Sequence, residues 1–138
     1  MPAENSIIDV SFDDLGESKT YEDGKECLLE IVYAAVNPTK DGSKVGLNVV
    51  FVDPDDDDVE EIRWWCELPT AARMEEDKRG GRRSLKQLKE FYTAFSVSTD
   101  GPVETDSLKG STGYVILGLE ESVEYGEQNK VKKFVIGR

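Results

Sequence analysis

A chain of 138 residues, of which 38% are hydrophobic, can build one domain around one core and does not have the composition of a disordered protein. The chain has no histidine, which excludes the Ser-His-Asp and Cys-His catalytic arrangements. It has two cysteines, Cys27 and Cys66, which are too few ligands for a structural zinc site. A formal net charge of -12 argues against a uniformly basic surface for duplex DNA.

The N-terminal third of the chain predicts an arm followed by two strands. Residues 1–26 are acidic and lack periodicity, so we expect a partly ordered arm whose apolar side chains between residues 7 and 15 dock on the domain. Residues 27–36, CLLEIVYAAV, favour a first strand. Turn residues at 37–42 then lead to a second strand over 44–52, in which every other side chain shares a face.

An acidic loop and an aromatic strand follow. Residues 53–58 contain a proline and adjacent like charges, which oppose a strand interior and indicate a hairpin loop. Residues 60–68 alternate clearly and predict a third strand. Its core face would carry Ile62, Trp64, Cys66 and Leu68, and its outer face Glu61, Arg63, Trp65 and Glu67.

The remaining chain predicts one helix and two more strands. After a polar linker at 69–81, Ser84 is the expected N-cap of a helix that runs to about Phe95, with apolar residues at three-to-four spacing. Residues 113–121 and 129–136 predict strands four and five around a turn at 124–128. This order predicts a mainly β protein: a five-stranded OB-fold barrel over residues 27–138, with one α-helix between strands 3 and 4.

Several segments resemble the OB-fold single-stranded-DNA-binding proteins of bacteriophages. They are LLEIVYAAVNPTKDGSKVGLNVVFVD, EIRWWCELP, SLKQLKEFYTAFSV, DSLKGSTGYVILGLEES and YGEQNKVKKFVIGR, which together cover about residues 26–137. The resemblance implies a non-sequence-specific single-stranded-DNA-binding protein of phage replication, recombination or repair. Two departures are that Ser-Thr-Gly and not a basic residue follows Gly110, and that no acidic tail follows the last strand. Recruitment of replication or recombination proteins would therefore use the acidic segments 1–26 or 53–61.

The charges of the chain are segregated, which is compatible with a basic groove on an acidic body. Residues 63–89 hold eight bases against four acids, and residues 128–138 hold four bases and no acid. Single-stranded DNA needs cations for phosphates and exposed aromatic faces for stacking. Within the OB fold, the usual face crosses strands two and three between the first and last hairpins. The candidate nucleic-acid-binding residues are therefore Trp65, Arg63, Lys40, Lys44, Tyr125, Lys130, Lys132, Arg82 and Arg83.

Each candidate also has a plainer interpretation. Trp64 is expected in the core, and Trp65 either stacks on bases or packs under the arm. The plainer interpretation of Arg63 is that it only pairs with Glu61 or Glu67, and such a surface pair contributes little. The basic residues from Arg82 to Lys89 are equally typical of a solvated helix face. We expect Tyr33 and Tyr114 to pack rather than to stack.

Catalytic and metal functions find little support in the sequence. The acidic run DPDDDDVEE lacks the spacing and the glycine of a calcium loop, and phosphate-binding glycine motifs are absent. We expect no enzyme activity, no cofactor and no metal. The alternative function is an acidic protein-interaction module, or a nucleic-acid decoy that binds a basic host protein. With no apolar run of about 18–20 residues and no signal-peptide pattern, we expect a soluble protein of the cytoplasm, that of the host cell if it is viral.

Overall fold

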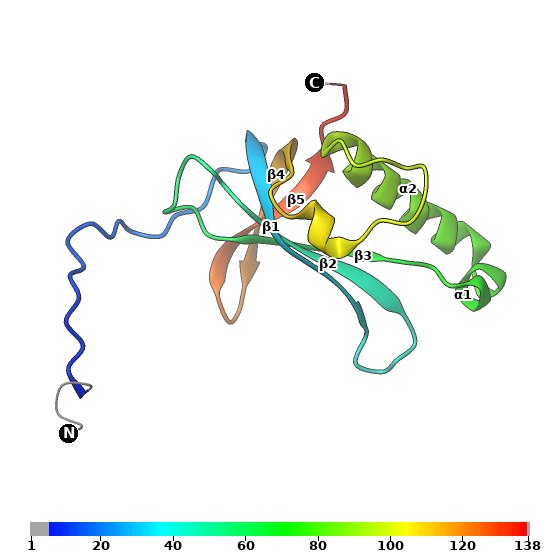
Figure 1. Cartoon of the computed structure of the whole chain (residues 1–138), viewed down its shortest axis with the longest axis horizontal. Coiled ribbons are helices and arrows are strands. Elements are labelled where there is room, and N and C mark those ends of the chain that lie inside the picture. Colours follow the sequence, from blue (N-terminus) through cyan, green and yellow to red (C-terminus); the bar gives the residue numbers. More distant parts are fainter. Residues whose placement is uncertain (1–5, 138) are drawn as a thin grey trace.

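The computed structural model describes residues 6–137, which form a five-stranded antiparallel sheet with helices between the third and fourth strands (Figure 1). The strands run in the order β3-β2-β1-β4-β5 across the sheet. Their bounds are β1 Glu26–Pro38, β2 Val45–Val52, β3 Ile62–Glu67, β4 Thr112–Ser122 and β5 Gly126–Phe134. The helical segments between β3 and β4 are α1 Ala71–Glu76, α2 Lys78–Ala94 and the 3-10 turn η2 Thr105–Leu108.

The predicted mainly β class, the five strands and the long helix between strands three and four are confirmed. The closed barrel is wrong: within residues 6–137 no backbone pairing joins the two outer strands, β3 and β5. Side chains fill the gap between β3 and β5 instead, and we call this gap the β3–β5 seam. The rings of Trp64 and Phe134 meet edge to face with centroids 4.9 Å apart, and Gln87 and Glu90 of α2 line the same place. The two edges are therefore joined by aromatic packing rather than by a hydrogen-bonded ladder.

Strand β1 serves both halves of the sheet. Its first residues, 26–30, pair with β4, and residues 30–38 pair with β2. The register with β2 shifts between Ile31 and Tyr33, so Val32 is an extra residue, a β-bulge. Because side chains alternate with a period of two, one extra residue reverses which face the following side chains occupy. Ala34 becomes buried as a result, and Tyr33 becomes exposed.

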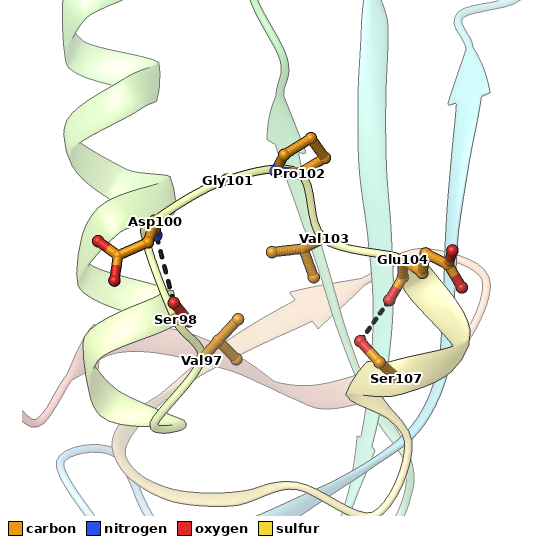
Figure 2. Close-up of a pocket in the computed structure, with 8 residues that line it drawn as sticks. All are labelled: Val97, Ser98, Asp100, Gly101, Pro102, Val103, Glu104 and Ser107. Atoms are coloured by element: carbon orange, nitrogen blue, oxygen red, sulfur yellow. Dashed lines mark hydrogen bonds between the residues drawn. The ribbon is translucent and has the colours of Figure 1, made fainter.

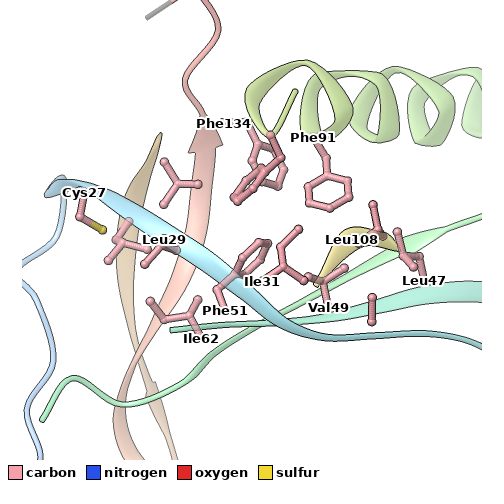
Figure 3. Close-up of a cluster of buried hydrophobic side chains, with 14 residues drawn as sticks. Cys27, Leu29, Ile31, Leu47, Val49, Phe51, Ile62, Phe91, Leu108 and Phe134 are labelled. Carbon is pink, nitrogen blue, oxygen red and sulfur yellow. The ribbon is translucent and has the colours of Figure 1, made fainter. Parts of the chain in front are cut away.

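The core lies between α2 and the inner face of the sheet (Figure 3). Phe91 of α2 is fully buried, and its ring contacts those of Phe51, Trp64 and Phe134. The helix ends close to β4 because Gly113 has no side chain: a Cβ there would lie 2.6 Å from the carbonyl oxygen of Ala94. The aromatic side of α2 therefore covers the inner face of the sheet and shields the core from solvent.

The helical region begins earlier than the sequence analysis expected. Asp77, not Ser84, is the N-cap of α2, and its Oδ1 accepts a hydrogen bond from the Gly80 amide at 3.0 Å. Thr70 caps α1 in the same way, accepting from the Arg73 amide at 3.2 Å. Most of the expected linker 69–81 is thus helical, because two polar caps lie within it.

The first described residues do not dock as predicted. The apolar side chains of the arm segment, residues 6–17, are 63–88% exposed; they are Ile7, Ile8, Val10, Phe12 and Leu15. Within the described residues, no helix is both long and apolar enough to cross a bilayer.

Residues 19–25 form a strap that does bind to the sheet. The Lys19 amide donates to the Asp58 carbonyl at 2.9 Å, and the side-chain amide of Asn129 bonds both the N–H and the C=O of Tyr21, at 2.7 and 2.9 Å. The Tyr21 hydroxyl donates to the carboxylate of buried Asp53, which holds the pKa of Tyr21 well above its usual range. The strap therefore joins the acidic loop to β4 and β5.

Candidate nucleic-acid interface

The outward side of β1, β2 and β3 presents an aromatic and polar surface. Cross-strand pairing places Val50 between Tyr33 and Arg63, and Asn48 between Ala35 and Trp65. All of these residues except Ala35 line a groove of about 420 Å³. We name this surface the Trp65 face and define it by Tyr33, Asn37, Asn48, Val50, Arg63 and Trp65.

Trp65 lies against bare backbone on this face. A Cβ on Gly46 would be 1.9 Å from the indole Nε1, so only glycine at that position lets the ring settle there. The indole is 43% exposed and lines both the groove and the neighbouring hollow at the β1–β2 hairpin. Of the two interpretations of Trp65, packing under the arm is therefore not what the structure shows. An aromatic ring held in place with an open surface can accept a stacked base.

The β1–β2 hairpin adds two lysines beside the indole. Lys40 and Lys44 line the same hollow as Trp65, and within residues 6–137 neither amine has a carboxylate within 4.0 Å. The nearby carboxylate of Asp41 is used within the turn. Its Oδ1 accepts hydrogen bonds from Thr39 Oγ1 at 2.7 Å, from Ser43 Oγ at 2.8 Å and from the Ser43 amide at 3.0 Å. The turn is thereby ordered while the two lysines stay available.

These hydrogen bonds make the order of the β1–β2 turn depend on pH. The bond from the Ser43 amide, followed by those from the Thr39 and Ser43 hydroxyls, lowers the pKa of Asp41 from 3.8 to about 2. Because the folded pKa is depressed, the order that Asp41 gives the turn is fully present above pH 3.8 and is lost as the pH falls through about 2. We expect an NMR titration of the Asp41 carboxyl carbon and the Ser43 amide to share a midpoint near 2. A midpoint near 4, or a Ser43 amide shift unchanged by Asp41→Asn, would contradict it.

Arg63 contributes a third cation to the Trp65 face. Its side chain is 80% exposed, and the nearest carboxylate, that of Glu61, is 4.0 Å away. Glu67, the other partner considered from the sequence, is bound to Arg73 at 2.8 Å. An exposed pair at 4.0 Å holds the guanidinium weakly, so a phosphate can replace the carboxylate.

The other predicted binding residues lie elsewhere. Tyr125 is exposed at the tip of the β4–β5 hairpin, which is separated from the β1–β2 hairpin in Figure 1. Lys130 and Lys132 of β5 already have acidic partners, Glu120 at 3.6 Å and Asp23 at 3.5 Å. Arg82 and Arg83 line a separate groove on α2. The structure thus gathers Trp65, Arg63, Lys40 and Lys44 and leaves the other five apart from them.

Tyr33 is the site residue that the sequence analysis missed. A regular β1 would place Tyr33 on the core face with Leu29 and Ile31, but the bulge at Val32 turns it outward, where it is 50% exposed. Asn48 and Asn37 also belong to this face, and Asn48 Nδ2 donates to Asn37 Oδ1 at 3.1 Å. The sequence signal was the small residue Ala34 directly after Tyr33. Ala34 is buried in the structure, which means that the side chains after the bulge face the opposite side from those in a regular strand.

Another surface hollow does not have this character. It lies between the end of α2 and η2, lined by residues 97–107 (Figure 2). Its polar groups bond one another: the Asp100 amide donates to Ser98 Oγ at 3.2 Å, and Ser107 Oγ donates to the Glu104 carbonyl at 2.6 Å. The lining holds two carboxylates and no cation or aromatic ring, so it does not suit a nucleic acid.

The carboxylates of the predicted acidic loop also bind protein groups. Asp53 accepts from the Asp55 amide at 2.8 Å in addition to Tyr21, and Asp56 pairs with Lys19 at 2.5 Å. Within the described residues no cluster of three acidic, cysteine or histidine side chains has the arrangement of a metal site. The loop therefore supports the strap in this structure.

Comparison with known proteins adds no family assignment. No protein-family model matches the chain, and no curated protein matches it.

Proposed function

We propose that this protein binds single-stranded DNA across the Trp65 face, without sequence specificity and without catalysing a reaction. The observation that carries the proposal is the exposed Trp65 indole, seated on Gly46 and bordered by Lys40, Lys44 and Arg63. A π-face for bases beside cations for phosphates is the combination that single-strand binding requires.

Each part of the face has a distinct role in the proposed complex. One base stacks on Trp65, and Tyr33 offers a second ring across the groove. Lys40, Lys44 and Arg63 neutralise backbone phosphates along the strand. Stacking and phosphate contacts read no base edges, so binding tolerates any sequence.

The acidic remainder of the protein favours single strands over duplex. A net charge of -12 repels the high charge density of duplex DNA, and the cations of the Trp65 face are few. A flexible single strand can follow a short strip of cations and unstack its bases onto the rings. Binding of this kind protects a strand and keeps it unpaired.

The sheet order and the helix between β3 and β4 support a finer proposal, that the fold is an OB fold whose β3–β5 seam stays open. With the segment resemblances, this supports a role in phage DNA replication, recombination or repair.

A salt series tests the proposal. Three phosphate contacts on a single strand predict a slope of about -2 for the logarithm of the binding constant against the logarithm of salt concentration. The measurement is quenching of tryptophan fluorescence on titration with oligo-dT. Lys40→Ala combined with Lys44→Ala is expected to bring the slope to about -0.7, while Lys109→Ala on a remote loop leaves it unchanged.

Absence of binding to any single strand in low salt would reject the proposal. It would leave the alternative function, a module that captures a basic protein, as the better account of the acidic surface.

A further inference from the structure

The outer side of α2 carries a groove of about 520 Å³ that no part of the described chain fills. We call it the α2 groove and define it by Arg79, Arg82, Arg83, Leu85, Lys86 and Lys89. The cations recur at three-to-four spacing, so they share one side of the helix and repel one another. Within residues 6–137 none of the five has a carboxylate within 4.0 Å.

Leu85 gives this groove an apolar centre. Its side chain is 45% exposed although it sits among five cations. The aliphatic stems of arginine and lysine extend such an apolar surface while their charged ends stay in water. A ligand that fits the whole groove must therefore be both anionic and apolar.

The arm segment, residues 6–17, has that composition. It carries four acids, Asp9, Asp13, Asp14 and Glu17, and no base. Five large apolar side chains are interspersed among these acids and are exposed, as described above. The arm segment and the α2 groove are thus complementary in charge and in apolar surface.

The arm segment does not reach the α2 groove of its own chain. In Figure 1 the arm extends from the side of the sheet opposite α2. The strap fixes its base there, because the Lys19 backbone is bonded to Asp58 and Glu60. A second copy can present its α2 to the arm without this constraint.

We propose that the arm segment of one copy binds the α2 groove of a second copy. Because the two surfaces differ, the contact is head-to-tail, and repetition of it produces a closed ring or an open chain of copies, according to the rotation between neighbours. The contact uses no residue of the Trp65 face and does not depend on the proposed function.

DNA is the competing occupant of the α2 groove, and the arm segment suits it better. Phosphates would satisfy the five cations but leave Leu85 and the apolar arm residues in water. The arm segment covers both kinds of surface at once, which removes two exposed apolar patches together.

Sedimentation velocity on the full chain without DNA tests the inference. We expect the weight-average sedimentation coefficient to rise with protein concentration in low salt and to fall to the monomer value in high salt, where exposed charges are screened. Arg82→Glu with Arg83→Glu is expected to weaken association about tenfold or more, since two attractive charges become repulsive and the net charge of the groove falls from +5 to +1. Phe12→Ser with Leu15→Ser should weaken it as well, whereas Val123→Ser, at a fully exposed apolar residue on the β4–β5 turn, should not.

Two controls separate this inference from the proposed function. Lys40→Glu with Lys44→Glu changes the net charge by the same amount as the α2 double variant. It should abolish oligonucleotide binding and leave self-association intact. Mixing the α2 double variant with an Asp13→Arg, Asp14→Arg variant should restore one-to-one association, because the unaltered acidic arm of the first then meets the unaltered basic α2 groove of the second.

A chain that stays monomeric at every concentration and salt would overturn the inference, including the case in which the arm folds onto its own α2. Association unchanged by the α2 double variant would also overturn it. If that variant lost only oligonucleotide affinity, the α2 groove would be assigned to DNA.

Discussion

Trp65→Ala is expected to weaken binding of single-stranded DNA by about 1–3 kcal/mol, roughly 5- to 150-fold, the contribution of one stacked base. The loss should be confined to binding, because the indole rests on the outer side of the sheet against Gly46 and is not part of the core. Fluorescence anisotropy of a labelled oligonucleotide measures it, since the variant keeps only Trp64 as an intrinsic fluorophore.

Two further variants show whether stacking is the cause. Trp65→Phe keeps an aromatic ring and should recover part of the affinity, whereas Tyr125→Ala, on the distant β4–β5 hairpin, should have little effect. Equal affinity of Trp65→Ala and the unaltered protein would remove the indole from the interface. A larger loss in Tyr125→Ala than in Trp65→Ala would move the interface to the other hairpin.

Phe91→Ala is expected to lower the free energy of unfolding by about 3–5 kcal/mol. Phe91 is fully buried, and its ring contacts rings of β2, β3 and β5 as well as those of Tyr92 and Phe95, so no neighbour can fill the space without losing other contacts. It also supports Trp64, which lies in the open seam between β3 and β5. Denaturation in urea, read from the midpoint and the slope, gives the change directly.

Lys86→Ala on the exposed side of the same helix is the matched control, with an expected change within about 0.5 kcal/mol. A cost below about 1 kcal/mol for Phe91→Ala would mean that α2 is not a structural part of the core. In that case the interpretation of the helix as the cover of the inner face of the sheet would be wrong.

Strands β2 and β3 were predictable because their side chains alternate with a period of two and turn residues bound them. β2 and β3 begin and end within about two residues of the expected positions. Closure of the sheet was not predictable, because strand periodicity reports which side chains face inward and not whether two edges exchange hydrogen bonds. The seam is instead filled by Trp64 and Phe134, which are far apart in the sequence.

The candidate site was predictable where it follows from local pattern. Arg63 and Trp65 share a face by strict alternation, and the hairpin brings Lys40 and Lys44 to the same edge. Tyr33 was missed because one bulged residue reverses its side. Lys130 and Lys132 were expected to be available, but Glu120 and Asp23 come to them only through the pairing of β4 with β5 and the path of the strap.

The strap also bears on how the chain can be cut or extended. Residues 19–25 precede the first strand, yet removing them would leave the buried carboxylate of Asp53 without the Tyr21 hydroxyl and would expose the amide of Asn129. A fusion partner or a fluorescent label joined at Ser18 would keep both groups satisfied, whereas one joined at Cys27 would not. We therefore expect the shortest stably folded version of this protein to start at Lys19, eight residues before Cys27, where the strand pattern of the sequence begins.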